Sequence, residues 1–227
     1  MYVRYREYTL ALALALILTA GAHAAEPGGA QVSDRTELGS FPDLPPDSVD
    51  LAAGNITVVN LDVEASTFRW VGLMGNTTGS IVLGDGDSNV LFNWNASGNI
   101  VYASEGTPVW SNLQNVSEEN VTTILPFLAA GANDAYNETF TNSPESIGSN
   151  LFTINATFAV TESANTTVWK TYALWDESDL VFAGKVVHGG VSFRSPTDFV
   201  DFQMILPEDG TQGGAVATTY NLWVENI

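Results

Sequence analysis

The feature that most constrains the fold is a series of short apolar segments that recur about every ten residues between turn-forming clusters. Segments this short, rich in Val, Ile, Phe, Tyr and Trp, are typical of β-strands joined by hairpins. The segments span 55–63, 66–75, 79–85, 89–94, 98–104, 151–160, 166–175, 179–187, 198–206 and 218–227. We therefore predict an all-β fold, a single antiparallel β-sandwich of about nine or ten strands.

The segment 151–160 shows the alternation most clearly. Apolar residues at Phe152, Ile154, Ala156 and Phe158 share one face, and Thr153, Asn155 and Thr157 share the other. Because successive side chains of a strand point to opposite faces, we expect Asn155 to point outward.

One stretch, residues 115–131, departs from the strand pattern. Ser117 is a favourable helix N-cap, and Glu118 and Glu119 follow where the helix dipole favours acids. Pro126 interrupts the stretch and Gly131 is a plausible stop, so we predict one short or kinked helical insert.

The N-terminus has the pattern of a secretory signal peptide. Arg4 and Arg6 precede an apolar run of about thirteen residues, and small residues at Ala22 and Ala24 precede the expected cleavage point. The run is shorter than the roughly twenty residues that cross a bilayer, although an uncleaved anchor helix is an alternative. We predict a signal peptide at 1–24, no transmembrane segment after cleavage, and an extracellular or cell-surface location.

Residues 25–50 are rich in Pro and Gly and poor in periodic apolar residues, which predicts a flexible arm ahead of a β-sandwich domain at 51–227. The arm could reach a neighbouring copy and add a strand to its sheet edge through Ala30–Phe41. Its prolines oppose this hypothesis because proline donates no backbone hydrogen bond.

The charge balance is strongly acidic. The formal net charge is −19 for the whole chain, and it becomes −20 when the signal is removed. Such a field repels phosphate backbones and anionic lipids, so we expect no nucleic-acid partner. A surface rich in acids and poor in lysine suits high salt, where repulsion between charges is screened. We therefore favour a halophilic host, with simple acidity as the alternative.

Eight Asn-x-Ser/Thr triplets occur, against about three expected by chance, and they predict an N-glycosylated protein. A glycan must reach solvent, so each occupied asparagine is also expected to be exposed. The eight are Asn55, Asn76, Asn95, Asn115, Asn120, Asn137, Asn155 and Asn165.

The acidic cluster at 85–89 resembles the first half of a calcium loop, with Asp85, Asp87 and Asn89 as candidate ligands. Val90 and Ala96 stand where the complete loop has its glycine and its bidentate glutamate. We therefore favour a hairpin turn between two strands, with a weak calcium or magnesium site as the alternative and no other cofactor expected.

The sequence offers no catalytic constellation. Cysteine is absent, and His188 is the only histidine after the predicted signal. A multi-histidine zinc site is therefore excluded, and no histidine other than His188 is available for a Ser-His-Asp triad. We expect His188 to be an exposed or hydrogen-bonded turn residue. Six tryptophans lie mostly among aliphatic strand residues, which predicts core positions over an exposed sugar-stacking platform.

Two motifs carry a resemblance. A W-x-G-x-x-G-N element (Trp70, Gly72, Gly75, Asn76) and the segment Asp201–Gly210, "DFQMILPEDG", follow the order of a group of uncharacterised archaeal secreted proteins. The resemblance spans roughly Ser66 to Ile227. It implies a secreted, sequon-rich β-sandwich surface protein, and it transfers no functional residues because that group has no assigned activity.

We therefore expect an exported acidic glycoprotein with a structural or interaction role, as an envelope, filament or matrix subunit. Its partners would be copies of itself, other surface proteins or glycans. A carbohydrate-binding or adhesin module is the first alternative, and a secreted hydrolase that uses two carboxylates is the second.

Overall fold

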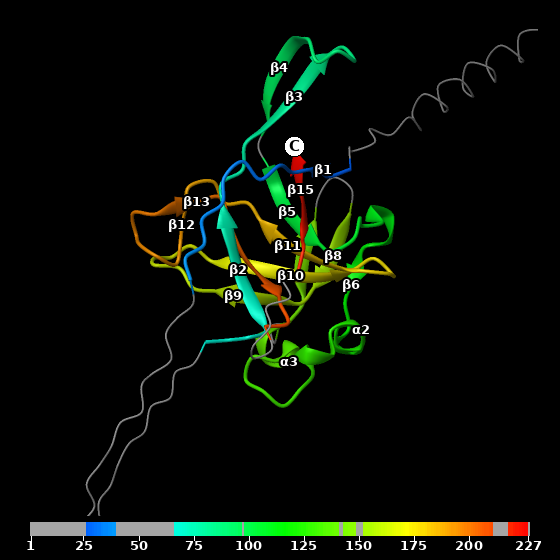
Figure 1. The fold of residues 1–227 in the computed structure, drawn as a ribbon, viewed down its shortest axis with the longest axis vertical. Coiled ribbons are helices and arrows are strands. Elements are labelled where there is room, and N and C mark those ends of the chain that lie inside the picture. Colours follow the sequence, from blue (N-terminus) through cyan, green and yellow to red (C-terminus); the bar gives the residue numbers. More distant parts are fainter. Residues whose placement is uncertain are drawn as a thin grey trace, which may run out of the picture.

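The computed structural model describes residues 26–39, 66–96, 98–140, 143–148, 152–210 and 218–226. Within these ranges the chain is mostly β, its sheets are antiparallel, and its two α-helices are short. The predicted all-β class with a helical insert is confirmed (Figure 1). The predicted signal peptide at 1–24 and the predicted strand at 55–63 lie outside the described residues.

A seven-stranded sheet forms the centre of the molecule, in the order β1-β15-β5-β11-β10-β6 with β9 also paired to β10. All the pairings in this sheet are antiparallel. Its strands are β1 (Gly28–Gly29), β15 (Asn221–Asn226), β5 (Gly98–Ser104), β11 (Leu180–Lys185), β10 (Trp169–Trp175), β6 (Gln114–Asn115) and β9 (Phe158–Thr161).

One face of this sheet packs against the strand pair β2 (Trp70–Gly75) and β14 (Phe202–Pro207) together with the helical insert. Side chains of alternate sheet residues, such as Val101 and Phe182, meet Met204 from β14 and Val121 from the insert. Because successive side chains of a strand point to opposite faces, every second residue of each central strand packs into the core on this face of the sheet.

The opposite face is covered by the hairpin of β7 (Glu145–Gly148) and β8 (Thr153–Ala156) and by the short 3-10 helix η1 (Trp110–Asn112). Tyr102 and Tyr172, from the intervening sheet positions, are fully buried here against Trp110 and Ile147. With both faces covered by smaller strand pairs, the arrangement is sandwich-like.

The helical insert agrees with its sequence signals at its start. Helix α2 spans Glu118–Ile124, and Ser117 Oγ accepts the backbone N–H of Asn120 at 3.2 Å. Pro126 begins the 3-10 helix η2 (Pro126–Leu128), so the helix breaks where proline was expected to break it and ends before Gly131. A second helix, α3 (Tyr136–Thr139), was not predicted.

The segment 151–160 divides into β8 and β9, which pair with different partners, whereas a single strand was expected. The predicted alternation is nevertheless confirmed, since Ala156 and Phe158 are buried and Asn155 is exposed. The division follows from tertiary pairing, because one half joins the central sheet and the other half folds over it.

Two further pairs complete the described strands: β12 (Gly190–Val191) with β13 (Phe199–Val200), and β3 (Gly79–Gly84) with β4 (Val90–Ala96). The β3–β4 pair projects away from the rest of the molecule (Figure 1). Among the described residues, no helix is long and apolar enough to cross a membrane.

Candidate functional site

The projecting β3–β4 pair, which we call the ribbon, carries apolar side chains in solvent. Leu91 is 81% exposed and Phe92 is 53% exposed, and Leu83 and Val90 are also exposed. Leu83 is paired directly with Phe92, so these two side chains lie side by side on one face. An isolated two-stranded ribbon is marginally stable in water, and exposed clusters of this kind mark interaction sites.

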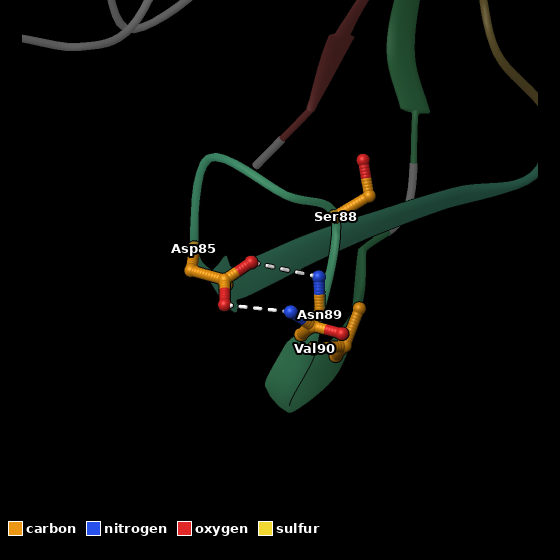
Figure 2. A pocket seen from close by; sticks show the side chains of 5 residues that line it. Asp85, Ser88, Asn89 and Val90 are labelled. Atoms are coloured by element: carbon orange, nitrogen blue, oxygen red, sulfur yellow. Dashed lines mark hydrogen bonds between the residues drawn. The ribbon is translucent and has the colours of Figure 1, made fainter.

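The turn at the end of the ribbon is built around Asp85 (Figure 2). Its Oδ1 accepts the backbone N–H groups of Asp87 at 3.0 Å and Asn89 at 2.9 Å, and its Oδ2 accepts Asn89 Nδ2 at 2.8 Å. Ser88 adopts a positive φ of 67°, which reverses the chain. The predicted hairpin is confirmed, and Asp85 is the residue that organises its turn.

The candidate calcium ligands Asp85, Asp87 and Asn89 are the residues that make these turn hydrogen bonds. The hydrogen bond from the Asn89 side chain, with backbone bonds from Asn89 and Asp87, holds the pKa of Asp85 below its ordinary value. Asn89 directs an N–H group, a donor, toward Asp85, so these two residues satisfy each other. Within the described ranges, acidic and histidine side chains form no group of three or more suited to a metal ion.

Asp201 fastens the base of the ribbon to the body. Its carboxylate accepts the backbone N–H of Thr77 at 2.9 Å and that of Gly189 at 3.2 Å, and its own N–H donates to Gly75 O at 2.8 Å. His188 Nδ1 lies 3.4 Å from Asp201 Oδ1, and His188 is exposed in a turn, as the sequence predicted. Burial alone would raise the pKa of Asp201, but these hydrogen bonds hold it below its ordinary value.

The sequon asparagines differ in exposure. Asn76, Asn115, Asn155 and Asn165 are exposed, whereas Asn120 and Asn137 are partly buried. The Oδ1 atom of Asn137 is buried without a hydrogen-bond partner in the described structure. Asn95 belongs to strand β4, but its side chain is not described, and Asn55 lies outside the described residues. Four asparagines therefore present the exposure that glycosylation requires.

Five tryptophans belong to the core or border it, as their sequence context predicted. Trp110 and Trp169 are buried, and Trp70, Trp175 and Trp223 pack against the two core clusters. The structure does not describe the side chain of Trp94. None of the five described indoles thus supplies an exposed sugar-stacking platform.

Two clusters of ionisable side chains could not be recognised from the sequence, because their members come from distant segments. Burial, then the charges of Asp179 and Glu208, raise the pKa of Glu105. On the other side of the sheet, Glu145 lies 2.6 Å from Lys170 Nζ and accepts the Tyr172 hydroxyl, while Lys185 Nζ lies 3.9 Å away. Both lysines of the chain therefore hold the β7–β8 hairpin onto the sheet, which is a structural role.

Comparison of the chain with protein-family models, with curated proteins and with solved structures finds no match. The functional conclusion therefore rests on the residues themselves.

Proposed function

We propose that this protein is an exported, acidic, glycosylated subunit with a structural or interaction role at the cell surface. The exposed apolar ribbon carries this proposal. Soluble monomeric proteins rarely leave several large apolar side chains together in water, and doing so on a projecting two-stranded element is costly unless another surface covers it. The proposal also takes in two expectations from the sequence. One is the resemblance of Ser66–Ile227 to archaeal secreted surface proteins, and the other is a halophilic host.

The distribution of exposed sequons supports the same proposal. Asn155 and Asn165 lie on the surface of the body, and Asn76 lies at the base of the ribbon, so glycans there would not displace core residues. An acidic, glycosylated surface keeps copies soluble in high salt, while a limited apolar ribbon supplies specific adhesion.

The experiment compares the wild-type protein with Leu91→Asp, both released from their own cells and examined by negative-stain electron microscopy in high salt. We expect ordered filaments or sheets from the wild type and mainly single particles from the variant. The reason is that a carboxylate at the most exposed apolar position opposes burial of the ribbon.

The matched control is Val168→Asp, the same kind of change at an apolar residue that is 59% exposed outside the ribbon. It should assemble like the wild type, and both variants should melt at the wild-type temperature. Uniform single particles from the wild-type protein would contradict the proposal. Assemblies that persist unchanged in Leu91→Asp would show that the ribbon is not the contact.

A further inference from the structure

The outer edge of the central sheet holds a strand that contributes little to the core. Strand β1 consists of two glycines, and its register places Gly28 opposite Val224 and Gly29 opposite Trp223. The backbone N–H of Ala30 extends the pairing by donating to Leu222 O at 2.7 Å. The sequence pattern placed the possible added strand at Ala30–Phe41. The residues that pair are instead Gly28, Gly29 and Ala30, at the start of the arm, so the predicted and observed segments share only Ala30.

The attachment of this strand to its own chain is slight. Pro27 is buried, but every described residue from Gln31 to Gly39 is exposed and belongs to no strand. Neither core cluster contains a residue from 26–39, so the described core is complete without the arm. A strand held by backbone hydrogen bonds, with no side chains of its own, pairs equally well with any copy of the same edge.

The length of the connecting chain permits that exchange. Ala30 and Trp70 are separated by 39 residues, and a chain of that length spans at most about 130 Å when fully extended. This exceeds the diameter of a domain of this size, so the arm of one copy can reach the β15 edge of the next.

We propose that β1 is an exchangeable strand: residues Pro27–Ala30 of one copy pair with Leu222–Val224 of a second copy, in the register seen within the chain. The inference rests on the proposed function, because export and cleavage after Ala24 would leave Pro27 as the third residue of a free end. Donor and acceptor are different surfaces, so repeated exchange links copies head to tail into a ring or an open filament.

The test uses the absence of cysteine from the chain. Two single-cysteine variants, Gly28→Cys and Val224→Cys, are co-expressed and exported together, oxidised mildly and examined on non-reducing gels. A Cβ at Gly28 has its nearest neighbour at 4.0 Å, so the new side chain fits. Because each chain carries one cysteine, a disulfide between positions 28 and 224, identified by mass spectrometry, joins two copies.

We expect the 28–224 disulfide in assemblies of the mixed variants, and at least tenfold less disulfide when Val32→Cys replaces Gly28→Cys. Position 32 is exposed and lies four residues along the arm, out of register. A second variant, Ala30→Pro, removes the N–H that donates to Leu222, and it should lower the 28–224 yield about fivefold, as expected for one hydrogen bond. Val32→Pro is its control.

The outcomes separate this inference from the proposed function. If electron microscopy shows ordered assemblies, but the mixture gives no 28–224 disulfide and the Gly28→Cys/Val224→Cys double variant gives an internal one, the strand stays in its own chain. The exchange is then overturned while the surface role stands. If neither assemblies nor intermolecular disulfides form, both proposals fail.

Discussion

At the scale of the residue, aspartates organise the turns of this protein. Asp85 accepts three hydrogen bonds within the ribbon turn, and Asp201 accepts backbone N–H groups from two separate segments. Asp176 does the same inside the protein: it is 1% exposed and accepts hydrogen bonds from Val109, Ser178 and Asp179. These carboxylates therefore account structurally for part of the acidic composition.

Asp176→Asn is expected to destabilise the protein. Burial alone would raise the pKa of Asp176, but hydrogen bonds from Asp179, Val109 and Ser178 hold it below its ordinary value of 3.8. An amide in its place turns an N–H group toward a donor, which costs about 1–3 kcal/mol of unfolding free energy at pH 7. Urea unfolding measures this loss.

The pH dependence provides the check on this prediction. A carboxylate with a lowered folded-state pKa stabilises the fold above its unfolded-state pKa and loses that contribution as pH falls through the folded-state pKa. The gap between wild type and Asp176→Asn should therefore close at pH values below about 3.8. A gap that stays constant down to pH 2 would assign the loss to packing. Asp87→Asn, in the exposed turn, should change stability by less than about 0.5 kcal/mol.

At the scale of the element, the helical insert and the ribbon behave differently. Helix α2 is capped by Ser117 and buries Val121 in the core, so its local signals and its packing favour the same structure. The ribbon has a well-made turn and an antiparallel pairing whose register shifts between Leu83 and Gly84, but it leaves Leu91 and Phe92 in solvent. Both elements form backbone hydrogen bonds, but among the described side chains only the helix buries an apolar one in the core.

Ser117→Ala is expected to lower the unfolding free energy by about 1 kcal/mol, because the first turn of α2 loses its side-chain acceptor. Ser117 is also the hydroxyl residue of the Asn115 sequon, so the measurement uses protein made without glycosylation. Ser117→Thr keeps the acceptor and should lie within about 0.5 kcal/mol of the wild type. Equal losses in both variants would show that the cap contributes nothing.

At the scale of the whole molecule, charge sets the conditions under which the fold is stable. The mature chain is predicted to carry a net charge of −20, and its described basic residues include the two lysines already paired with Glu145. Few cations remain to offset the other acids, so self-repulsion opposes the compact state at low salt.

The melting temperature is therefore expected to rise by about 5 °C, or roughly 2 kcal/mol, between 0.1 M and 2 M KCl at pH 7. Calorimetry across this range measures the change. The rise should be smaller at pH 4, where part of the carboxylates are protonated. A melting temperature that does not respond to salt at pH 7 would contradict the predicted role of self-repulsion.

Much of the local structure could be predicted from the sequence, because it depends on neighbouring residues. The alternation that buries Ala156 and Phe158, the Ser117 cap, the break at Pro126 and the hairpin around Asp85 all arise within a few positions of the chain. The signal-peptide pattern at 1–24 and the eight sequons likewise predict export and glycosylation without reference to a fold.

The candidate site depended on tertiary structure. The sequence alone determined that 79–96 forms a hairpin, but it did not determine that this hairpin would stand outside the core with Leu83, Val90, Leu91 and Phe92 exposed. The division of 151–160 between two sheets, the meeting of Lys170 and Lys185 at Glu145, and the pairing of Gly28 with Val224 were likewise decided by the fold. The physical reason is that propensity and periodicity act over a few residues, whereas burial and strand pairing depend on which distant segments arrive at the same place.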